Sequence, residues 1–215
     1  MASSRVSCVY VIVLLLNFSV SVFPGVVKEV ATSDLNDFPL ISRDGWHAEP
    51  SANQKLLKLP TPYVVIHHTY IPKACYSFEE CANAMRSMQR YHKSSLKWGD
   101  IGYNFCIGAE GTAFEGRGWD YKGIHAGRAN NHSIGICMIG DWREKLPPKK
   151  SMDTLKALIK IGVQMGKIRE DYKLIGHMQA MSTECPGTAL MAEISTWKNF
   201  AQGKPDFAQI SSISN

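Results

Sequence analysis

Short apolar runs rich in β-branched residues predict the strands of a buried sheet. Five such runs occur along the chain, at residues 62–68, 103–108, 112–116, 133–140 and 173–176. The second and third are joined by Ala109-Glu110-Gly111, a connection typical of a hairpin. The fourth run is apolar almost throughout, so we expect that strand to be covered on both faces.

Between these runs, apolar residues recur at helical spacing in three segments. The first segment covers residues 77–94 and carries Phe78, Cys81, Ala82, Met85 and Met88 at that spacing. The second starts near Ser151, which we interpret as its N-cap, and the third covers residues 188–200. Because strands and helices alternate, the sequence predicts an α/β fold. We expect one central, mixed β-sheet flanked by about three helices.

The periodic pattern is continuous from Leu40 to about Phe200, without a Gly/Ser linker, an internal repeat or a low-complexity run, and we place the domain at residues 39–202. A chain of 215 residues usually forms one domain, and we expect a single domain over this range. Residues 23–38 lack periodicity and predict an irregular lead. Residues 203–215 contain Gly203, Pro205 and a Ser/Ile mixture, which predicts a flexible tail.

Residues 1–22 show the pattern of a secretory signal peptide. Arg5 precedes an apolar run that begins at Cys8, and the small residues Ser19 and Ser21 follow that run. A membrane anchor is the alternative, but the apolar stretch of about 15 residues is shorter than the roughly 20 that a spanning helix needs. We therefore predict a secreted, extracellular protein without a membrane span.

Composition and charge narrow the function classes. Hydrophobic residues make up 45% of the chain and charged residues 20%, which is ordinary for a globular protein. The net charge of +5 is not concentrated in a Lys/Arg cluster dense enough to follow a phosphate backbone, so nucleic acid is a poor partner. A modest positive charge does suit an anionic polymer such as a bacterial cell wall.

The pairing of the cysteines matters because disulfides form in secreted proteins. Removing the signal peptide leaves an odd number, namely Cys75, Cys81, Cys106, Cys137 and Cys185. Cys75 and Cys81 are close in sequence at a helix start, and we choose them as the disulfide. We interpret the two cysteines in strand-like runs, Cys106 and Cys137, as buried small hydrophobic residues. Cys185 remains unpaired.

The unpaired cysteine, with two histidines, could bind a metal ion. His67 ends the first predicted strand, His177 follows the last one, and Cys185 lies eight residues beyond His177. Two imidazoles and a thiolate are a common zinc set, and three protein ligands leave a fourth position for water. A lone histidine is more often a core residue, and we interpret His92, His125 and His132 as core or exposed residues.

Four motifs resemble the peptidoglycan recognition proteins, a family that shares its fold with phage-type N-acetylmuramoyl-L-alanine amidases. They are Val64-Val65-Ile66-His67-His68-Thr69, Asp100-Ile101-Gly102-Tyr103-Asn104-Phe105, Glu115-Gly116-Arg117-Gly118-Trp119 and Thr183-Glu184-Cys185-Pro186-Gly187. Residues 140–149 resemble the catalytic insect members of the LB type in particular. The resemblance implies a secreted amidase that cuts the bond between muramic acid and L-alanine in bacterial peptidoglycan and muropeptides, and so scavenges immune elicitors.

Carried over by position, the resemblance implies that His67, His177 and Cys185 hold Zn²⁺. It also places Tyr103 and Thr183 beside the metal as catalytic residues. Members that only bind wall fragments commonly have serine at the third ligand position, so Cys185 favours catalysis. The competing hypotheses are a receptor that binds peptidoglycan without cutting it, and a zinc endopeptidase, which needs the same chemical apparatus.

The resemblance also implies a groove for the stem peptide. Diaminopimelate binders in the family tend to have arginine within the Glu-Gly-x-Gly-Trp motif, where this chain has Arg117, and a Gly-Trp pair where it has Lys97-Trp98. A guanidinium can hold the extra carboxylate of diaminopimelate, so we expect a preference for that wall type. We expect His68 to line the groove as a non-ligand.

Two further positions bear on this family pattern. Met178 follows His177 where the family usually has arginine, which puts the contacts of that arginine in doubt. Asn131-His132-Ser133 is a glycosylation sequon, and it is meaningful if the chain is secreted.

Overall fold

The structure, a computed structural model, describes residues 38–207. The predicted signal peptide and nearly all of the predicted lead lie outside these residues. Six strands form one sheet: β1 (Leu40–Ile41), β2 (Thr61–His68), β3 (Phe105–Ile107), β4 (Ala113–Glu115), β5 (Ser133–Met138) and β6 (Ile168–Gly176). Their order across the sheet is β1-β4-β3-β5-β2-β6. Only β3 and β4 pair antiparallel, so the sheet is mixed, as predicted.

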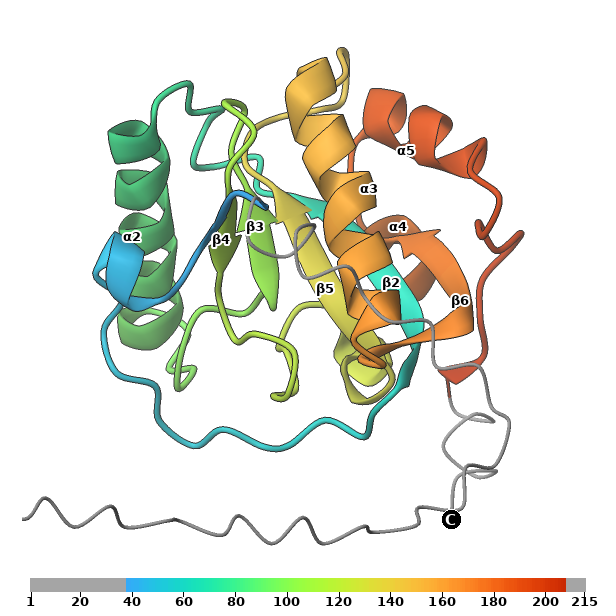
Figure 1. Cartoon of the computed structure of the whole chain (residues 1–215), viewed down its shortest axis with the longest axis horizontal. Helices are drawn as coiled ribbons and strands as arrows, with labels where there is room; N and C mark the ends of the chain where they lie inside the picture. Colours follow the sequence, from blue (N-terminus) through green and yellow to red (C-terminus); the bar gives the residue numbers. More distant parts are fainter. Residues whose placement is uncertain (1–37, 208–215) are drawn as a thin grey trace, which may run out of the picture.

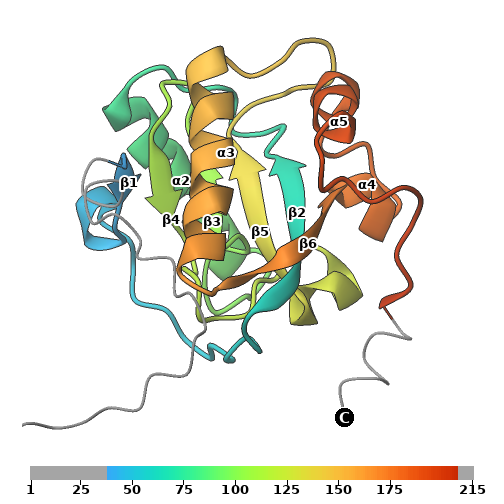
Figure 2. The same cartoon turned by 45° about the vertical axis from the view of Figure 1, so that its right-hand side comes forward.

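Helices cover both faces of this sheet (Figures 1 and 2). The described residues form α2 (Phe78–Ser94), α3 (Lys149–Gln164), the short α4 (His177–Ala180), α5 (Thr188–Ser195) and the 3-10 turns η1 (Asp44–Trp46) and η2 (Gly127–Asn131). Helices α3 and α5 pack on one face around Ile66, Ile136 and Leu158. Helix α2 packs on the other, with Met85 against Phe114. The predicted α/β class is confirmed.

Helix α2 forms where the periodicity predicts it. The side chain of Ser77 caps it by accepting a hydrogen bond from the backbone N–H of Glu80, at 3.3 Å. Cys81, Met85 and Met88 point inward and are buried. Capping removes an unsatisfied N–H from the first turn, and burial of the apolar stripe supplies most of the helix's stability.

Helix α3 corrects one prediction. Ser151 is not its N-cap, because the helix begins at Lys149 and the N-cap position is Pro148. The buried hydroxyl of Ser151 instead donates to the carbonyls of Gly108 and Ala109, at 2.8 and 3.0 Å. A serine near a helix start can serve either the helix or a neighbouring loop, and here it fixes α3 to the β3–β4 hairpin.

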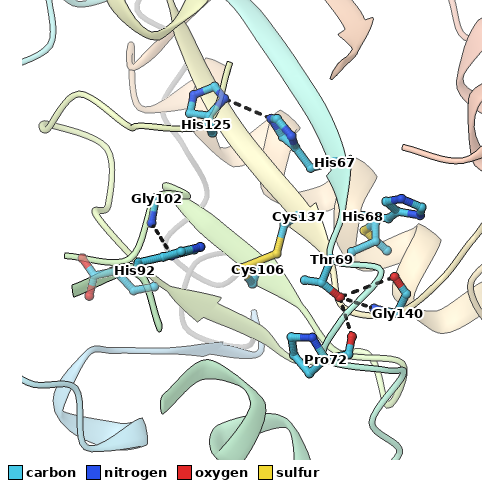
Figure 3. Close-up of a disulfide and its surroundings, with 12 residues drawn as sticks. His67, His68, Thr69, Pro72, His92, Gly102, Cys106, His125, Cys137 and Gly140 are labelled. Carbon is cyan, nitrogen blue, oxygen red and sulfur yellow. Dashed lines mark hydrogen bonds between the residues drawn. A yellow bond between two sulfur atoms is a disulfide. The ribbon is translucent and has the colours of Figure 1, made fainter. Parts of the chain in front are cut away.

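The cysteines correct another interpretation. The structure joins Cys75 to Cys81, the pair we chose, but it also joins Cys106 to Cys137. These two are register partners on the neighbouring strands β3 and β5, with Cα atoms 4.5 Å apart (Figure 3). Interpreting them as separate small hydrophobic residues was wrong, because their contact depends on strand order and register. Cys185 is the free cysteine of the described residues.

Beyond Gln202, where we expected a flexible tail, Gly203, Lys204 and Asp206 are exposed but Phe207 is buried. Phe207 is buried in a small cluster with Val65, Ala126 and Ile175. Its ring centroid lies 5.1 Å from that of Tyr63 on β2. Burying a phenylalanine stabilises the fold by about 2 kcal/mol, enough to hold the first residues of this segment against the sheet. The remainder of the segment lies outside the described residues.

None of the helices in the described part of the chain is long and apolar enough to span a bilayer.

Candidate metal centre and substrate cleft

The three predicted metal ligands converge at one edge of the sheet. His67 lies at the end of β2, and His177 begins α4 directly after β6. These two strands are parallel neighbours, so their carboxyl ends meet. Cys185 reaches the same point from the loop between α4 and α5. One ligand atom from each of the three residues lies within 4.8 Å of the others.

The spacing of these atoms fits a zinc ion. Cys185 Sγ lies 3.8 Å from His67 Nδ1, close to the separation of about 3.5 Å between a sulfur and a nitrogen that share a tetrahedral zinc. Nε2 of His177 is buried and has no hydrogen-bond partner among the described residues. A buried polar atom without a partner is costly, and a metal ligand role would remove that cost. The residues present therefore suit zinc.

Burial keeps all three ligands uncharged before metal binds. It lowers the pKa of His67 well below the usual value and that of His177 to about 4, so both imidazoles are neutral at pH 7. Burial also raises the pKa of the Cys185 thiol to about 12. A metal must therefore displace the thiol proton. The backbone N–H of His68 points at Sγ, at 3.2 Å, and can stabilise the resulting thiolate.

Close backbone contacts fix the loop that carries Cys185. Its carbonyl accepts a hydrogen bond from the N–H of Met178, at 2.8 Å. Gly187 has φ of 96° and passes so near Trp142 that a Cβ atom would lie 2.5 Å from the Trp142 backbone. Any side chain there would both strain the backbone and push the loop away. The glycine therefore allows the loop to approach the segment after β5 that contains Trp142.

A cleft of about 510 Å³ opens beside the three ligands. It is lined by His68, Thr69, Tyr70, Tyr103, Arg143, His177, Thr183, Glu184 and Cys185. The Tyr103 ring centroid is 5.2 Å from that of His67, and burial raises the pKa of Tyr103. Tyr103 is thus a protonated phenol at pH 7 and can donate a hydrogen bond into the cleft. The Thr183 hydroxyl accepts from the N–H of Cys185, at 3.2 Å.

The cleft wall contains predicted and unpredicted residues. His68 lines it as expected, and its Nδ1 accepts from the N–H of Trp142, at 3.2 Å. Arg143 was not predicted as a site residue. Its guanidinium stacks on Tyr70 at 4.7 Å and bonds both carboxylate oxygens of Asp141, at 2.9 and 2.8 Å. Its position in the chain carries no local signal, because it reaches the cleft only through the turn after β5.

Residues 57–188 match the family model described as N-acetylmuramoyl-L-alanine amidase. Peptidoglycan-recognition protein LB of Drosophila melanogaster is 48% identical over 161 residues, which are 75% of this chain and 69% of that protein. This chain belongs to the peptidoglycan recognition protein family. The resemblance inferred from the four motifs is thereby confirmed.

Other relatives of this amidase-fold family extend the comparison. The N-acetylmuramoyl-L-alanine amidase of Homo sapiens is 40% identical over 176 residues, although these cover only 31% of that longer protein. A mutant of Drosophila PGRP-LB in complex with tracheal cytotoxin superposes with a TM-score of 0.75 at 47% identity, over 76% of this chain and 96% of that one. PGRP-LE, in complex with the same monomeric diaminopimelic acid-type peptidoglycan, gives 0.74 at 38%, over 76% and 96%.

The other predicted groove residues of this peptidoglycan recognition protein do not line the cleft. Arg117 is only 4% exposed, and its Nε donates to the carbonyl of Ile101, at 2.7 Å. Its Nη1 donates to the carbonyl of Lys122, at 3.2 Å, whereas Nη2 has no partner among the described residues. Trp98 packs against His92, with ring centroids 4.8 Å apart. These residues surround the segment 100–102, which leads to Tyr103.

Lys97 stands where the Gly-Trp pair of the diaminopimelate binders would have glycine. Its φ is 59°, in the left-handed region that glycine adopts without strain. The chain keeps this backbone conformation with lysine, so the turn before Trp98 is retained. The side chain of Lys97 is exposed.

Met178 does not disturb the metal ligands. It lies in α4 directly after His177, and its backbone N–H donates to the carbonyl of Cys185. The family's usual arginine there would add a charge that this chain lacks.

His125 is the residue at the metal centre that sequence reasoning missed. It was interpreted as a core or exposed histidine. The structure buries it with Nδ1 3.0 Å from Nε2 of His67 (Figure 3). Burial lowers the pKa of His125 to about 3, so its ring is neutral at pH 7. Two nearby glycines were the available signal: a Cβ atom on Gly123 would lie 2.3 Å from the His125 ring, and Gly127 has a positive φ of 56°.

Proposed function

We propose that this protein is a zinc-dependent N-acetylmuramoyl-L-alanine amidase that hydrolyses the amide between the lactyl group of muramic acid and L-alanine of peptidoglycan. The convergence of His67, His177 and Cys185 beside an open cleft carries this proposal. The name of the family model and the names of the curated relatives support it.

In this proposal the two imidazoles and the thiolate hold Zn²⁺. A zinc ion with these ligands keeps a net positive charge, which polarises a carbonyl and lowers the pKa of bound water toward neutrality. Tyr103 presents its phenol O–H to the same cleft and donates to the oxygen on which negative charge develops during attack. Thr183 also lines the cleft, and in this proposal its hydroxyl orients water or shares that oxygen. The backbone N–H of His68 donates a hydrogen bond to the thiolate of Cys185.

Hydrolysis is favoured over simple binding because the third ligand is cysteine. A serine hydroxyl is a poor zinc ligand at neutral pH, whereas a thiolate binds zinc at about 2.3 Å. A receptor that only binds wall fragments has no need for a free, buried thiol aimed at two histidines.

We further propose a preference for diaminopimelate-type peptidoglycan. The motif that carries Arg117 supports this preference, and a guanidinium can hold the extra carboxylate of diaminopimelate. The structure buries Arg117 outside the cleft lining, so this role requires the guanidinium to leave its bonds to the carbonyls of Ile101 and Lys122 when substrate binds. The complexes of PGRP-LB and PGRP-LE with tracheal cytotoxin support the preference by analogy.

We also propose that the protein is secreted and acts as a scavenger that removes immune-stimulating muropeptides. The signal peptide pattern at residues 1–22 supports secretion, as does the use of disulfides. Scavenging follows from the reaction, because cutting the stem peptide from the glycan destroys the ligand that a receptor recognises.

The decisive experiment is digestion of purified diaminopimelate-type peptidoglycan with the protein loaded with zinc. We expect new peptides with free L-alanine amino termini, identified by mass spectrometry. A chelator should abolish their release, and Cys185→Ser is the matched control that should remain inactive with zinc present. Intact substrate that sediments together with the protein would instead establish a receptor.

Substrate preference needs a separate measurement. Arg117→Val removes the guanidinium, and we expect it to reduce kcat/KM on diaminopimelate muropeptides by about 10-fold or more relative to lysine muropeptides, as for one charged hydrogen bond. An unchanged ratio would refute the assignment of Arg117. Arg117→Lys keeps the charge without the planar guanidinium, and its ratio of kcat/KM values should lie between those of wild type and Arg117→Val.

A further inference from the structure

We propose that His125 is a positioning residue that holds the His67 ring so that Nδ1 faces the metal. The inference rests on the proposed zinc site but concerns a residue outside the ligand set. His125 comes from the loop between β4 and β5, and it is not among the residues that line the cleft. Its role would be to act on zinc through His67.

The two nitrogens of His67 have different neighbours. Nε2 lies 3.0 Å from Nδ1 of His125, and Nδ1 lies 3.8 Å from Sγ of Cys185. The rings of His67 and His125 are nearly perpendicular, with an interplanar angle of 86° and centroids 4.9 Å apart. This edge-on arrangement directs a hydrogen bond along the line between the nitrogens. Both side chains are buried, so water does not compete for that bond.

Two glycines provide the space in which the His125 ring lies. A Cβ atom on Gly135 would come within 2.5 Å of the ring, and one on Gly123 within 2.3 Å. Neither glycine has a positive φ, so its lack of a side chain is required by space and not by backbone conformation. Gly135 pairs with Val65 on β2, two residues before His67. The imidazole therefore lies directly against the strands that carry the ligand.

The backbone around His125 is fixed independently of its side chain. Oδ1 of Asn130 accepts from the N–H of His125 and from that of Ala126, at 2.9 and 2.7 Å. The N–H of Ile124 donates to the carbonyl of Gly102, at 2.8 Å. On the sheet side, Oδ1 of Asn104 accepts from the N–H of Gly135, at 2.9 Å. Loop and strand are thus both anchored, and the His125 nitrogen has little freedom to move away.

Ligation through Nδ1 determines where the protons lie. A neutral His67 whose Nδ1 lone pair binds metal carries its proton on Nε2 and donates it. His125 must then accept at Nδ1 and carry its own proton on Nε2. A second partner of this kind usually orients a metal-bound histidine and raises its basicity, although carboxylates and carbonyls are the commoner partners.

A residue that merely packs would respond differently to substitution. Packing depends on ring shape, whereas positioning depends on an acceptor at the Nδ1 position. His125→Phe keeps an aromatic ring and removes the acceptor. His125→Asn loses the ring but places its Oδ1 close to the former Nδ1, so it is the conservative rescue. The two roles therefore predict opposite orders of effect for these two variants.

The test measures zinc binding directly, by competition with a chromophoric chelator, on the full folded protein without substrate. We expect His125→Phe to bind zinc about 10- to 100-fold more weakly than wild type, and His125→Asn to recover most of that loss. The visible absorption bands of the Co²⁺-substituted protein should shift in His125→Phe, because the ring of His67 is reoriented.

Equal zinc affinity and an unchanged cobalt spectrum in folded His125→Phe would overturn the inference. If that variant does not fold, His125→Gln serves instead, because its longer side chain misplaces the acceptor that His125→Asn retains; equal affinity of these two would also overturn it. A wild-type protein that takes up no zinc would overturn the proposed function together with this inference, whereas zinc binding unaffected by His125 would overturn the inference alone.

Discussion

Burial acts on each ionisable side chain at the metal centre in the direction that removes charge. It lowers the pKa of His67, His125 and His177 and raises that of Cys185 and Tyr103. Five titratable groups therefore meet without mutual repulsion at pH 7. A divalent ion that displaces only the Cys185 proton leaves the centre with net positive charge, which is the electrostatic condition for activating water.

Tyr103→Phe separates catalysis from metal binding. The phenyl ring keeps the contact with His67 and removes only the O–H that faces the cleft. We expect kcat on muropeptides to fall by about 10²- to 10³-fold, as for other oxyanion donors, while zinc affinity stays unchanged. Zinc titration and steady-state kinetics on the same preparation check this. Loss of both properties together would show that Tyr103 supports the ligands and not the reaction.

His92 makes stability depend on pH. Burial lowers its pKa to about 4, and its Nδ1 accepts from the N–H of Gly102, at 3.1 Å. Between pH 6.5 and pH 4 the unfolded chain thus binds a proton that the folded protein does not. The free energy of unfolding contributed by His92 is fully present above pH 6.5 and is lost as the pH falls toward 4.

His92→Gln, which cannot titrate, should therefore reduce the slope of unfolding free energy against pH in this window, by up to about 1.4 kcal/mol per pH unit. Urea unfolding of the metal-free protein at several pH values measures the slope. Metal must be absent because its own release of protons would obscure the effect. An identical slope in wild type and variant would contradict the assignment.

At the scale of elements, the sequence predicts what depends on local periodicity. It places His67 at a strand end and His177 after another strand, and these predictions need only hydrophobic patterns. It does not predict the Cys106–Cys137 disulfide or the contact of His125 with His67, because both require strand order and register. The prediction that Ser151 is an N-cap was wrong for a related reason, because a side chain that can cap a helix can equally form hydrogen bonds with a loop distant in sequence.

Gly187→Ala tests how the Cys185 loop is held. Gly187 has a positive φ, and a Cβ atom there would collide with the Trp142 backbone. Alanine would therefore both strain the backbone and displace the loop. Gly166 also has positive φ, 66°, but nothing lies within 4 Å of its Cβ position, and Gly166→Ala is the matched control. We expect the control to lose about 1 kcal/mol and to bind zinc normally.

Gly187→Ala should lose more stability than the control and should bind zinc at least about 10-fold more weakly, because a displaced Cys185 leaves the ligand set incomplete. Denaturant unfolding and zinc competition measure the two effects. Equal results for the two alanine variants would mean that backbone conformation alone, and not the approach to Trp142, makes glycine necessary.

At the scale of the molecule, the candidate metal centre brings together parts of the chain that are far apart in sequence. His67 and Cys185 are 118 residues apart, and between them lie the hairpin, β5, α3 and β6. The Cys185 loop is held to the sheet edge by the hydrogen bond from Met178, the close approach of Gly187 to Trp142 and the His68 N–H that points at Sγ. An ion bound by all three ligands would therefore close the fold as a cross-link does.

Zinc should accordingly stabilise the whole domain. A ligand at 1,000 times its dissociation constant stabilises the folded state by about 4 kcal/mol, if the unfolded chain does not bind it. For a domain of this size we expect removal of zinc by a chelator to lower Tm by roughly 8–16 °C. Cys185→Ala is the control, and its Tm should hardly respond to zinc or chelator because two neutral imidazoles bind the ion weakly. Scanning calorimetry of both proteins, with and without metal, measures the difference. A wild-type Tm that is equal with and without zinc would show that the three residues do not form a metal centre in solution, and the stabilising cross-link would be absent.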